Sequence, residues 1–244
     1  FVVLADTPTG RIRAHCPNPG RMQELLLPGK RLLFESARSP GRKTAFGLVA
    51  AEHNGSIVPL HTTRTNKIAE TLLIPLLFPN SIRVRAEVTY GNSRFDFAVE
   101  EEGGTQLVEV KSCSLCENRI AMFPDAPTQR GVKHLQEMAE LVRCGSYRGE
   151  RILGGTVVFV IGSPSPDAFV PNVHTDPVFA QTLSSVASIL NLHACAVGVD
   201  AEGYAQLSAA SVPIRLEPTE LSERNGGAYL LLLRLNTEHT LATG

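Results

Sequence analysis

Two neighbouring segments of this chain alternate between polar and hydrophobic residues, and a short polar turn joins them. The segments are residues 94–99 and 106–111, and the turn, residues 100–105, contains two glycines. A period of two residues predicts β-strands, and a short glycine-containing connection predicts that the strands pair as an antiparallel hairpin. In a symmetric hairpin Val99 lies opposite Gln106, and this register fixes the face on which every side chain of both strands lies.

The same register places two carboxyl groups next to each other. Asp96 lies directly across from Glu109, and Lys111 shares a face with Glu109 because side chains alternate along a strand. Directly opposed like charges destabilise a sheet, so we expect a cation between them. Mg²⁺ or Mn²⁺ suits such a site, with water and substrate phosphate as further ligands. The alternative is that Glu109 and Lys111 form a solvated ion pair on an exposed face of the sheet.

A third acid is available on the segment before the hairpin. Residues 66–74 predict a short helix with Asn66 as its N-cap, and Glu70 lies on this helix. Such a set suits phosphodiester hydrolysis, because a metal polarises the phosphoryl oxygen and lowers the pKa of a bound water. A lysine such as Lys111 can orient or deprotonate that water and offset charge in the transition state.

Further along the chain, a dense loop with two prolines leads into a predicted helix that ends near Arg143. Its hydrophobic stripe is 132, 135, 138, 139 and 142, and either Asp125 or Thr128 can cap it. The residues on the other side are polar and can form either a functional surface or an ordinary solvated one. They are Arg130, Lys133, His134 and Glu137.

The N-terminal part predicts a different architecture. Residues 1–61 contain five short strand-like segments separated by proline and glycine turns, with one helical turn at 22–26, which predicts a small closed β-barrel of the OB type. They carry eight Lys or Arg against four Asp or Glu, although the whole chain has a net charge of −1. We therefore divide the chain into an OB-like barrel at 1–61 that binds nucleic acid, and a mixed α/β domain at 62–244.

Two turn tips of the barrel carry cations that can contact phosphate, although solvated loops are the simpler alternative. The residues expected to contact nucleic acid are Asn18, Arg21, Arg42 and Lys43. In the second domain, further strands are expected at 82–90, 156–161 and 193–199, and a further helix at 178–190.

Cysteine count and hydropathy bear on the cellular location. The chain has five cysteines, an odd number, which favours a reduced, cytoplasmic protein over a disulfide framework. Cys113 and Cys116 have the spacing of a zinc pair, but no second pair of ligands follows, so two ordinary cysteines are the alternative. No apolar run approaches the roughly 18 residues that span a membrane. The first residues, 1–4, look like a strand whose start lies upstream.

Four blocks of the sequence resemble one known family. They are residues 15–22 (HCPNPGRM), 93–97 (SRFDF), 108–112 (VEVKS) and 123–135 (FPDAPTQRGVKHL). In this order they are similar to the signature blocks of the sugar fermentation stimulation protein A family, and the similarity extends from about residue 5 to 200. The chain differs from the usual family pattern at Pro19, where the family has threonine, and at Ser112, where it commonly has asparagine.

This resemblance implies an OB-like barrel followed by a domain similar to the PD-(D/E)xK nucleases, and it implies DNA binding, with double-stranded DNA as the expected form. Asp96 and Glu109 would then be metal ligands and Lys111 the catalytic lysine. The remaining residues implied for the active site are Glu70, Gln129, Arg130 and His134. Two rivals stay open: a DNA-binding regulator of sugar-utilisation genes that does not cleave, and a module that binds small molecules or proteins.

Overall fold

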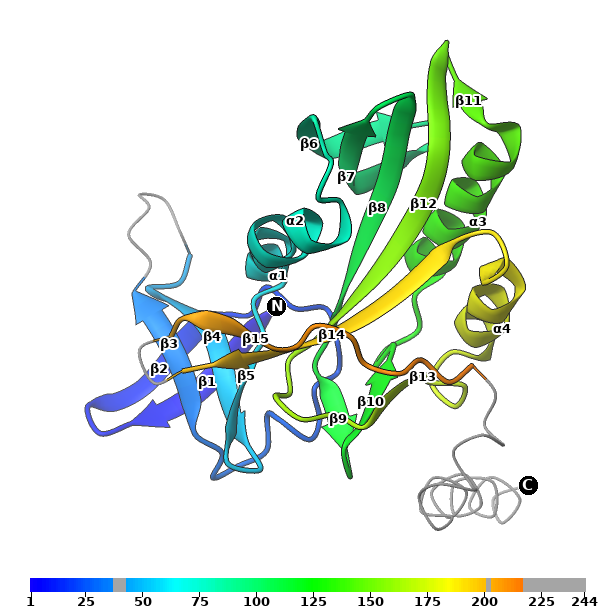
Figure 1. Cartoon of the computed structure of the whole chain (residues 1–244). Coiled ribbons are helices and arrows are strands. Elements are labelled where there is room, and N and C mark those ends of the chain that lie inside the picture. The colour runs from blue at the N-terminus through cyan, green and yellow to red at the C-terminus, as the bar shows by residue number, and fades with distance from the viewer. Residues whose placement is uncertain (37–42, 201–202, 217–244) are drawn as a thin grey trace.

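A computed structural model of the chain describes residues 1–36, 43–200 and 203–216. The N-terminal part folds into a small sheet, and the rest forms a larger sheet covered by helices (Figure 1). The strands of the small sheet are β1 (Val2–Thr7), β2 (Gly10–His15), β3 (Leu32–Ser36), β4 (Phe46–His53) and β5 (Ser56–Pro59). All five expected strands are therefore present.

The small sheet is organised around β4. The strand order is β1-β2-β4-β3, and β4 also pairs with β5. β3 lies along one edge of β4, whereas β2 and then β5 lie along the other edge. The curled sheet encloses a core that includes Leu25, Leu48 and Leu60. Among the described strands β1 and β3 do not pair with each other, so the barrel expected from the sequence is open along this seam.

A continuous helical segment leads from the barrel to the larger sheet. It consists of α1 (Thr62–Ile68), a π-helical turn η1 (Ala69–Leu73) and α2 (Ile74–Leu77). The prediction of a helix over 66–74 capped by Asn66 is wrong at both ends: His61 is the N-cap, and Asn66 lies inside α1. The helix also continues past Pro75, because proline at the second position of α2 needs no backbone hydrogen-bond donor there.

The larger sheet is mixed and has the order β15-β14-β12-β8-β7-β6, with β11 paired to β12. Its described strands are β6 (Arg83–Tyr90), β7 (Ser93–Glu101), β8 (Gly104–Cys113), β11 (Ser146–Tyr147), β12 (Glu150–Ile161), β14 (Asn191–Val199) and β15 (Ala205–Ala209). A smaller sheet beside it consists of β9 (Leu115–Glu117), β10 (Ile120–Phe123) and β13 (Ala168–Pro171). The three expected strands of the second domain correspond to β6, β12 and β14.

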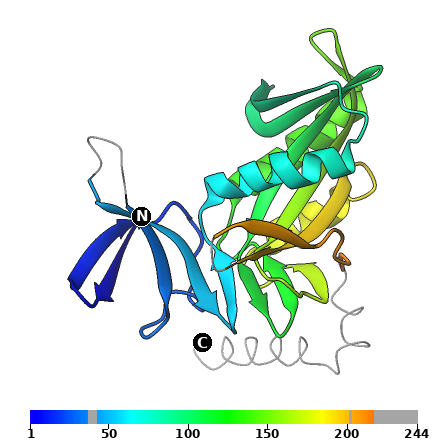
Figure 2. The same cartoon turned by 60° about the vertical axis from the view of Figure 1, so that its left-hand side comes forward.

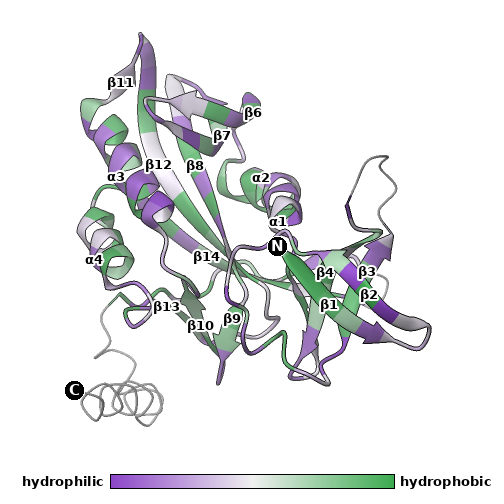
Figure 3. Ribbon diagram, turned by 180° about the vertical axis from the view of Figure 1, so that it is seen from behind, coloured by the Kyte–Doolittle hydropathy of each residue, from purple (hydrophilic) through white to green (hydrophobic). Residues whose placement is uncertain are grey.

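Helices cover both faces of the larger sheet (Figure 2). The α1–α2 segment packs on one face through Leu73 and Ile74. On the other face lie α3 (Gln129–Cys144) and α4 (Pro177–Val186), which are neighbours in Figure 3. Thr128 and Asp176 cap these two helices. None of the helices in the described ranges is both long and apolar enough to cross a membrane.

The hairpin register predicted from the sequence is confirmed. Val99 pairs with Gln106, and the last described pair joins Phe97 with Val108. Asp96 and Glu109 come next along the two strands. The fold is therefore a mixed α/β architecture, with β7 and β8 inside its larger sheet and the β8 strand flanked by β12.

Candidate functional site

A cavity of about 560 Å³ lies where the barrel, α1, the β7–β8 hairpin and the start of α3 meet. Its walls combine apolar and uncharged polar residues in similar number, with fewer charged ones. The charged residues are Asp96, Glu109, Lys111, Asp125 and Arg130. The cavity therefore brings together both carboxylates and the lysine that the sequence singled out.

Asp96 is held on the side of the cavity next to α1. Its Oδ1 accepts a hydrogen bond from Asn66 Nδ2 at 2.7 Å, and its Oδ2 accepts one from the backbone N–H of Val110 at 2.8 Å. Burial and the nearby charge of Glu109 together raise the pKa of Asp96 above its ordinary value, in spite of these two donors.

The direction of Asp96 follows from an irregularity in its strand. Phe95 packs in the core on the α3 side, whereas Phe97 packs in the core on the α1 side. Residues two apart share a face in a regular strand, so β7 is twisted at Asp96. In β6, Glu87 lies between the partners of Phe95 and Phe97 and has a positive φ of 55°. The twist turns the Asp96 carboxyl group toward α1.

Glu109 lies on the other side of β8 and is almost fully buried. Its Oε1 accepts hydrogen bonds from Lys111 Nζ and His134 Nδ1, each at 2.6 Å. Burial by itself raises the pKa of Glu109, but the charge of Lys111 and the hydrogen bond from His134 outweigh burial, and the pKa lies below its ordinary value. Among the described residues, none makes a hydrogen bond with its second oxygen, Oε2. A buried carboxylate oxygen without a partner is costly, and a cation bound there would satisfy it.

The Glu109–Lys111 pair is not the solvated surface pair that sequence left open. The side chain of Glu109 is 6% exposed and that of Lys111 is 11% exposed. A charge pair this well shielded from water is costly to desolvate and is a weak contributor to stability. Its position at a cavity therefore favours a role in binding or chemistry.

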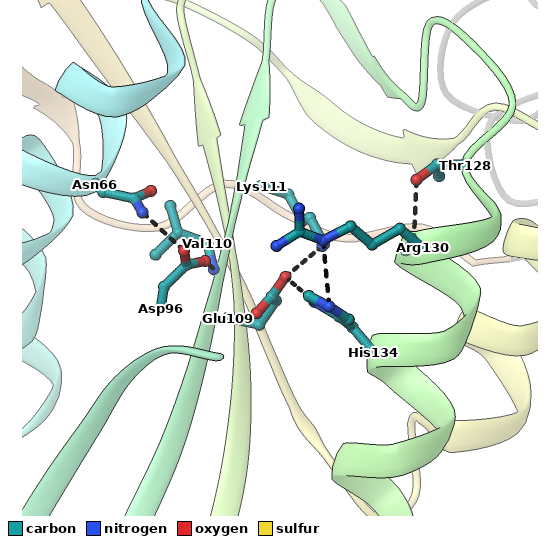
Figure 4. A network of polar contacts seen from close by, with 9 residues as sticks. Asn66, Asp96, Glu109, Val110, Lys111, Thr128, Arg130 and His134 are labelled. Atoms are coloured by element: carbon teal, nitrogen blue, oxygen red, sulfur yellow. Dashed lines mark hydrogen bonds and ion pairs between the residues drawn. The ribbon is translucent and has the colours of Figure 1, made fainter. Parts of the chain in front are cut away.

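His134 is also buried, although the sequence allowed its face of the helix to be a solvated surface. It is 5% exposed, and its ring lies against Phe95 and Glu109. Arg130 Nε lies 3.3 Å from His134 Nε2 and can only donate, so the His134 proton is on Nδ1 and points to Glu109. Arg130 and His134 therefore form a chain of donors that ends at Glu109 Oε1 (Figure 4).

Figure 4 also shows how the two carboxyl groups are arranged. Asp96 lies with Asn66 and Val110 on one side of β8, and Glu109 lies with His134 and Arg130 on the other. The expectation that the two carboxyl groups lie directly across from each other on one face is therefore wrong, because β7 is twisted at Asp96. They line the same cavity but have different hydrogen-bond partners. No group of three potential His, Cys, Asp or Glu ligands converges in the described part of the chain. That Asp96 and Glu109 share one ion thus stays a prediction, supported by the oxygen donors and the unpartnered Glu109 Oε2.

Of the other residues implied for the active site, some line the cavity and one does not. Gln129 and Arg130, in the first turn of α3, line the cavity. The structure does not bring Glu70 to it: Glu70 lies in the π-helical turn and pairs with Lys67 at 2.8 Å on a solvent-exposed side. Asn66, one turn earlier, occupies the position beside Asp96. The wider turn that begins at Ala69 rotates Glu70 away from the face that Asn66 shares with the cavity.

The residues proposed to contact nucleic acid also differ in position. Asn18 is buried and lines the cavity, whereas Arg21 and Lys43 are exposed on the barrel and do not line it. Arg42 lies outside the described residues.

Sequence reasoning missed two contributions. Asn66 was taken for a helix cap, and Asp125 for a possible cap of α3, although its Oδ2 accepts a hydrogen bond from the N–H of Met22 in the barrel at 3.0 Å. The two prolines of the loop at 123–128 predict an irregular backbone, but nothing local to the loop indicates a partner about a hundred residues away.

Comparisons with known proteins agree with this architecture. The domain described as "SfsA N-terminal OB domain" matches residues 1–60, and the one described as "Sugar fermentation stimulation protein RE domain" matches residues 63–203. A sugar fermentation stimulation protein homolog of Chloroflexus aurantiacus is 39% identical over 207 residues, which are 83% of this chain and 77% of the relative. A homolog of Acetivibrio thermocellus is 35% identical over 219 residues, 88% of this chain and 91% of the relative.

One solved structure, that of Pyrococcus furiosus SfsA in complex with Ca²⁺, is similar along almost the whole chain. Its TM-score is 0.77 and its sequence identity is 28%, with 88% of this chain and 90% of that chain covered. The mixed α/β fold with an N-terminal OB domain is thereby confirmed. On these matches and its own four sequence blocks, the chain belongs to the sugar fermentation stimulation protein family.

Proposed function

We propose that this protein binds DNA and hydrolyses a phosphodiester bond at the cavity between its two sheets, with Mg²⁺ or Mn²⁺ held by Asp96 and Glu109. The observation that carries the proposal is the buried Glu109, which has one oxygen without a partner and a lysine at 2.6 Å from the other. The similar Pyrococcus furiosus protein was solved in complex with Ca²⁺, which, like Mg²⁺, is a hard divalent cation that binds oxygen ligands.

The residues of the chain suit this chemistry. When bound, the metal would polarise the phosphoryl oxygen and lower the pKa of a water. Lys111 supplies a positive charge beside Glu109, where it can orient the attacking water and offset charge on the phosphate. His134 fixes the Glu109 carboxyl group through its Nδ1–H. Asn66 and the Val110 N–H do the same for Asp96.

We propose that the exposed cations of the barrel bind the DNA backbone. Arg21 and Lys43 are exposed there, and Arg42 is adjacent to Lys43 in the sequence. On the other side of the cavity, a groove of about 450 Å³ is lined by Arg94, Arg130 and Lys133. DNA as the partner is consistent with the cytoplasmic location expected from the cysteines.

A plasmid-nicking assay tests cleavage. We expect nicked or linear product with Mg²⁺ or Mn²⁺. For Lys111→Ala we expect the cleavage rate to fall by at least about 100-fold, since a positioned acid–base group contributes this much. Circular dichroism must show that the variant is folded, because removing Lys111 leaves Glu109 buried with one cationic neighbour fewer. Equal rates for both proteins would contradict the assignment of Lys111.

A second function, DNA binding without cleavage, is favoured by one observation. The Glu109 and Asp96 oxygens that have partners are bound by groups of the protein itself, Lys111 and Asn66 among them, so the site has internal charge compensation. A gel shift at two salt concentrations, combined with the nicking assay, separates these functions from each other and from a protein that does not bind DNA. Affinity for DNA that depends on phosphate contacts falls steeply with salt. A salt-sensitive shift without nicking supports the non-cleaving regulator. The absence of any shift at low salt points to a module that does not bind DNA.

A further inference from the structure

The cavity has the volume of a small-molecule site. Its volume of about 560 Å³ falls within the range of roughly 300–1,000 Å³ that encloses a ligand of drug size. Glu109 lies within this cavity and is only 4% exposed. A phosphate that reaches Glu109 must therefore enter the cavity with its neighbouring sugar and base, which a base paired inside a duplex cannot do without leaving the stack.

Three residues of one barrel segment, Asn18, Pro19 and Gly20, line the cavity. We call this segment, residues 17–22, the bridging segment. At one end, the Pro17 carbonyl accepts a hydrogen bond from Thr62 Oγ1 of α1 at 3.0 Å. At the other end, the Met22 N–H donates to Asp125 Oδ2 at 3.0 Å. The segment thus connects the two opposite sides of the cavity, α1 and the loop before α3, and it limits how far they can separate.

The bridging segment is also stiff. Asn18 is buried, and its Oδ1 accepts a hydrogen bond from the N–H of Gly20 at 2.9 Å. Pro19 between them fixes its own φ angle. A Cβ on Gly20 would overlap the carboxyl group of Asp125, so the backbone is packed directly against the opposite wall. Opening the cavity enough for two paired strands would break these contacts.

The lining suits one nucleotide strand. Hydroxyl groups that can bond to sugar, phosphate or base edges surround the carboxylates, and hydrophobic surface for a base lies at Met122 and Phe123. The cavity adjoins the groove that is lined by Arg94 and Lys133. Gln129 and Arg130 line both the cavity and this groove. The hydroxyl-bearing residues are Thr62, Thr63, Ser112, Ser114 and Thr128.

From these contacts we infer that the strand entering the cavity is unpaired, and that the bridging segment excludes duplex DNA from Glu109. The inference rests on the proposed function and names its substrate class: single-stranded DNA, or the unpaired tail of a duplex. The expectation of double-stranded DNA then applies only to contacts outside the cavity.

Fluorescence anisotropy with one sequence in three forms tests this: single strand, blunt duplex, and duplex with an unpaired tail. Binding is measured in Ca²⁺, the ion in the Pyrococcus furiosus relative, with the full chain. We expect the single strand and the tailed duplex to bind about tenfold more tightly than the blunt duplex, a difference of about 1.4 kcal/mol. Equal or tighter binding of the blunt duplex would overturn the inference but leave the proposed function standing.

Two variants test whether the bridging segment causes the preference for unpaired DNA over blunt duplex. The double variant Thr62→Val/Asp125→Ala removes the hydrogen bonds at both ends of the bridging segment, and we expect this preference to fall to about threefold or less. Thr71→Val is the matched control: its hydroxyl bonds within the helix to the Lys67 carbonyl and does not line the cavity, so the preference should be kept. Should the double variant fail to fold, Thr62→Val alone should shift the preference in the same direction. An unchanged preference refutes the role of the bridge, and failure of all three DNA forms to bind refutes the proposed function itself.

Discussion

At the scale of single residues, Glu109 has the most constrained environment in the site. Its Oε1 accepts one hydrogen bond from Lys111 and another from His134, which in turn accepts one from Arg130. Its Oε2 has no hydrogen bond within the described structure. Lys111 and His134 hold Glu109 as a carboxylate at neutral pH, whereas burial and the Glu109 charge work against ionisation of Asp96. The two carboxyl groups are thus in different environments within one cavity.

The residue-scale prediction for metal binding concerns Glu109. Glu109→Gln keeps the shape of the side chain but removes its charge, so we expect the affinity for Mn²⁺ to fall by at least about tenfold in titration calorimetry. Glu70→Gln is the control, because Glu70 pairs with Lys67 outside the cavity. A loss of affinity in Glu70→Gln, or none in Glu109→Gln, would contradict the ligand assignment made from the structure.

A second residue-scale prediction concerns ionisation of Tyr90. Burial, followed by its hydrogen bond to Glu150, raises the pKa of Tyr90 to about 12. An unfolded tyrosine ionises near its ordinary value of about 10, so the unfolded state loses its proton first and stability falls as the pH rises through this interval. Ultraviolet titration of the four tyrosines should show one late group, and Tyr90→Phe should remove it. If the late group persists in Tyr90→Phe, the assignment is wrong.

At the scale of elements, the N-termini of α3 and α4 are joined by one buried carboxylate. Asp176 Oδ1 accepts from the N–H of Phe179 and so caps α4, and its Oδ2 accepts from the N–H of Thr128, the cap of α3, at 2.8 Å. Because α3 carries Arg130 and His134, this contact fixes the position of the helix relative to Glu109. The local sequence predicts each cap but not the link between them.

We therefore expect Asp176→Ala to lower the free energy of unfolding by about 2–4 kcal/mol, the sum of a lost cap and an unsatisfied buried N–H. Asp176→Asn keeps an oxygen that can accept one of the two bonds, and its cost should be about half as large. Urea unfolding measures both. If Asp176→Ala lowers the free energy of unfolding by less than about 1 kcal/mol, water satisfies the two N–H groups in place of the carboxylate. The proposed cost of breaking the link would then be contradicted.

At the scale of the whole molecule, the shape of the cavity depends on how the barrel sits against the larger sheet. The bridging segment contacts both walls of the cavity, and a second contact lies beyond it, where His53 of β4 pairs with Glu117 of β9 at 2.8 Å. Gly162 at the end of β12 packs against Pro59 of β5. The interface is therefore held by specific contacts of side chains with the backbone and with each other, and it forms part of the candidate active site.

Substitution of Gly162 tests this interface. An alanine Cβ there would lie 2.9 Å from Pro59 Cδ, so we expect Gly162→Ala to cost about 1–3 kcal/mol of stability through overpacking. Gly198→Ala is a matched control, since its Cβ would meet Pro164 at an ordinary 3.6 Å and should change stability by less than about 0.5 kcal/mol. Equal effects of the two substitutions in urea unfolding would show that the barrel can shift without cost.

The sequence by itself determined most of the strands and the hairpin register. Alternation with a period of two and a short glycine turn are local properties, and they correctly paired Val99 with Gln106, although they wrongly put Asp96 on the same face as Glu109. The tertiary structure decided where each side chain points: the twist of β7 at Asp96, the burial of His134 and the departure of Glu70 from the site. It also decided that the barrel closes the cavity, because the contact of Met22 with Asp125 joins residues 103 positions apart, and no local pattern encodes such a contact.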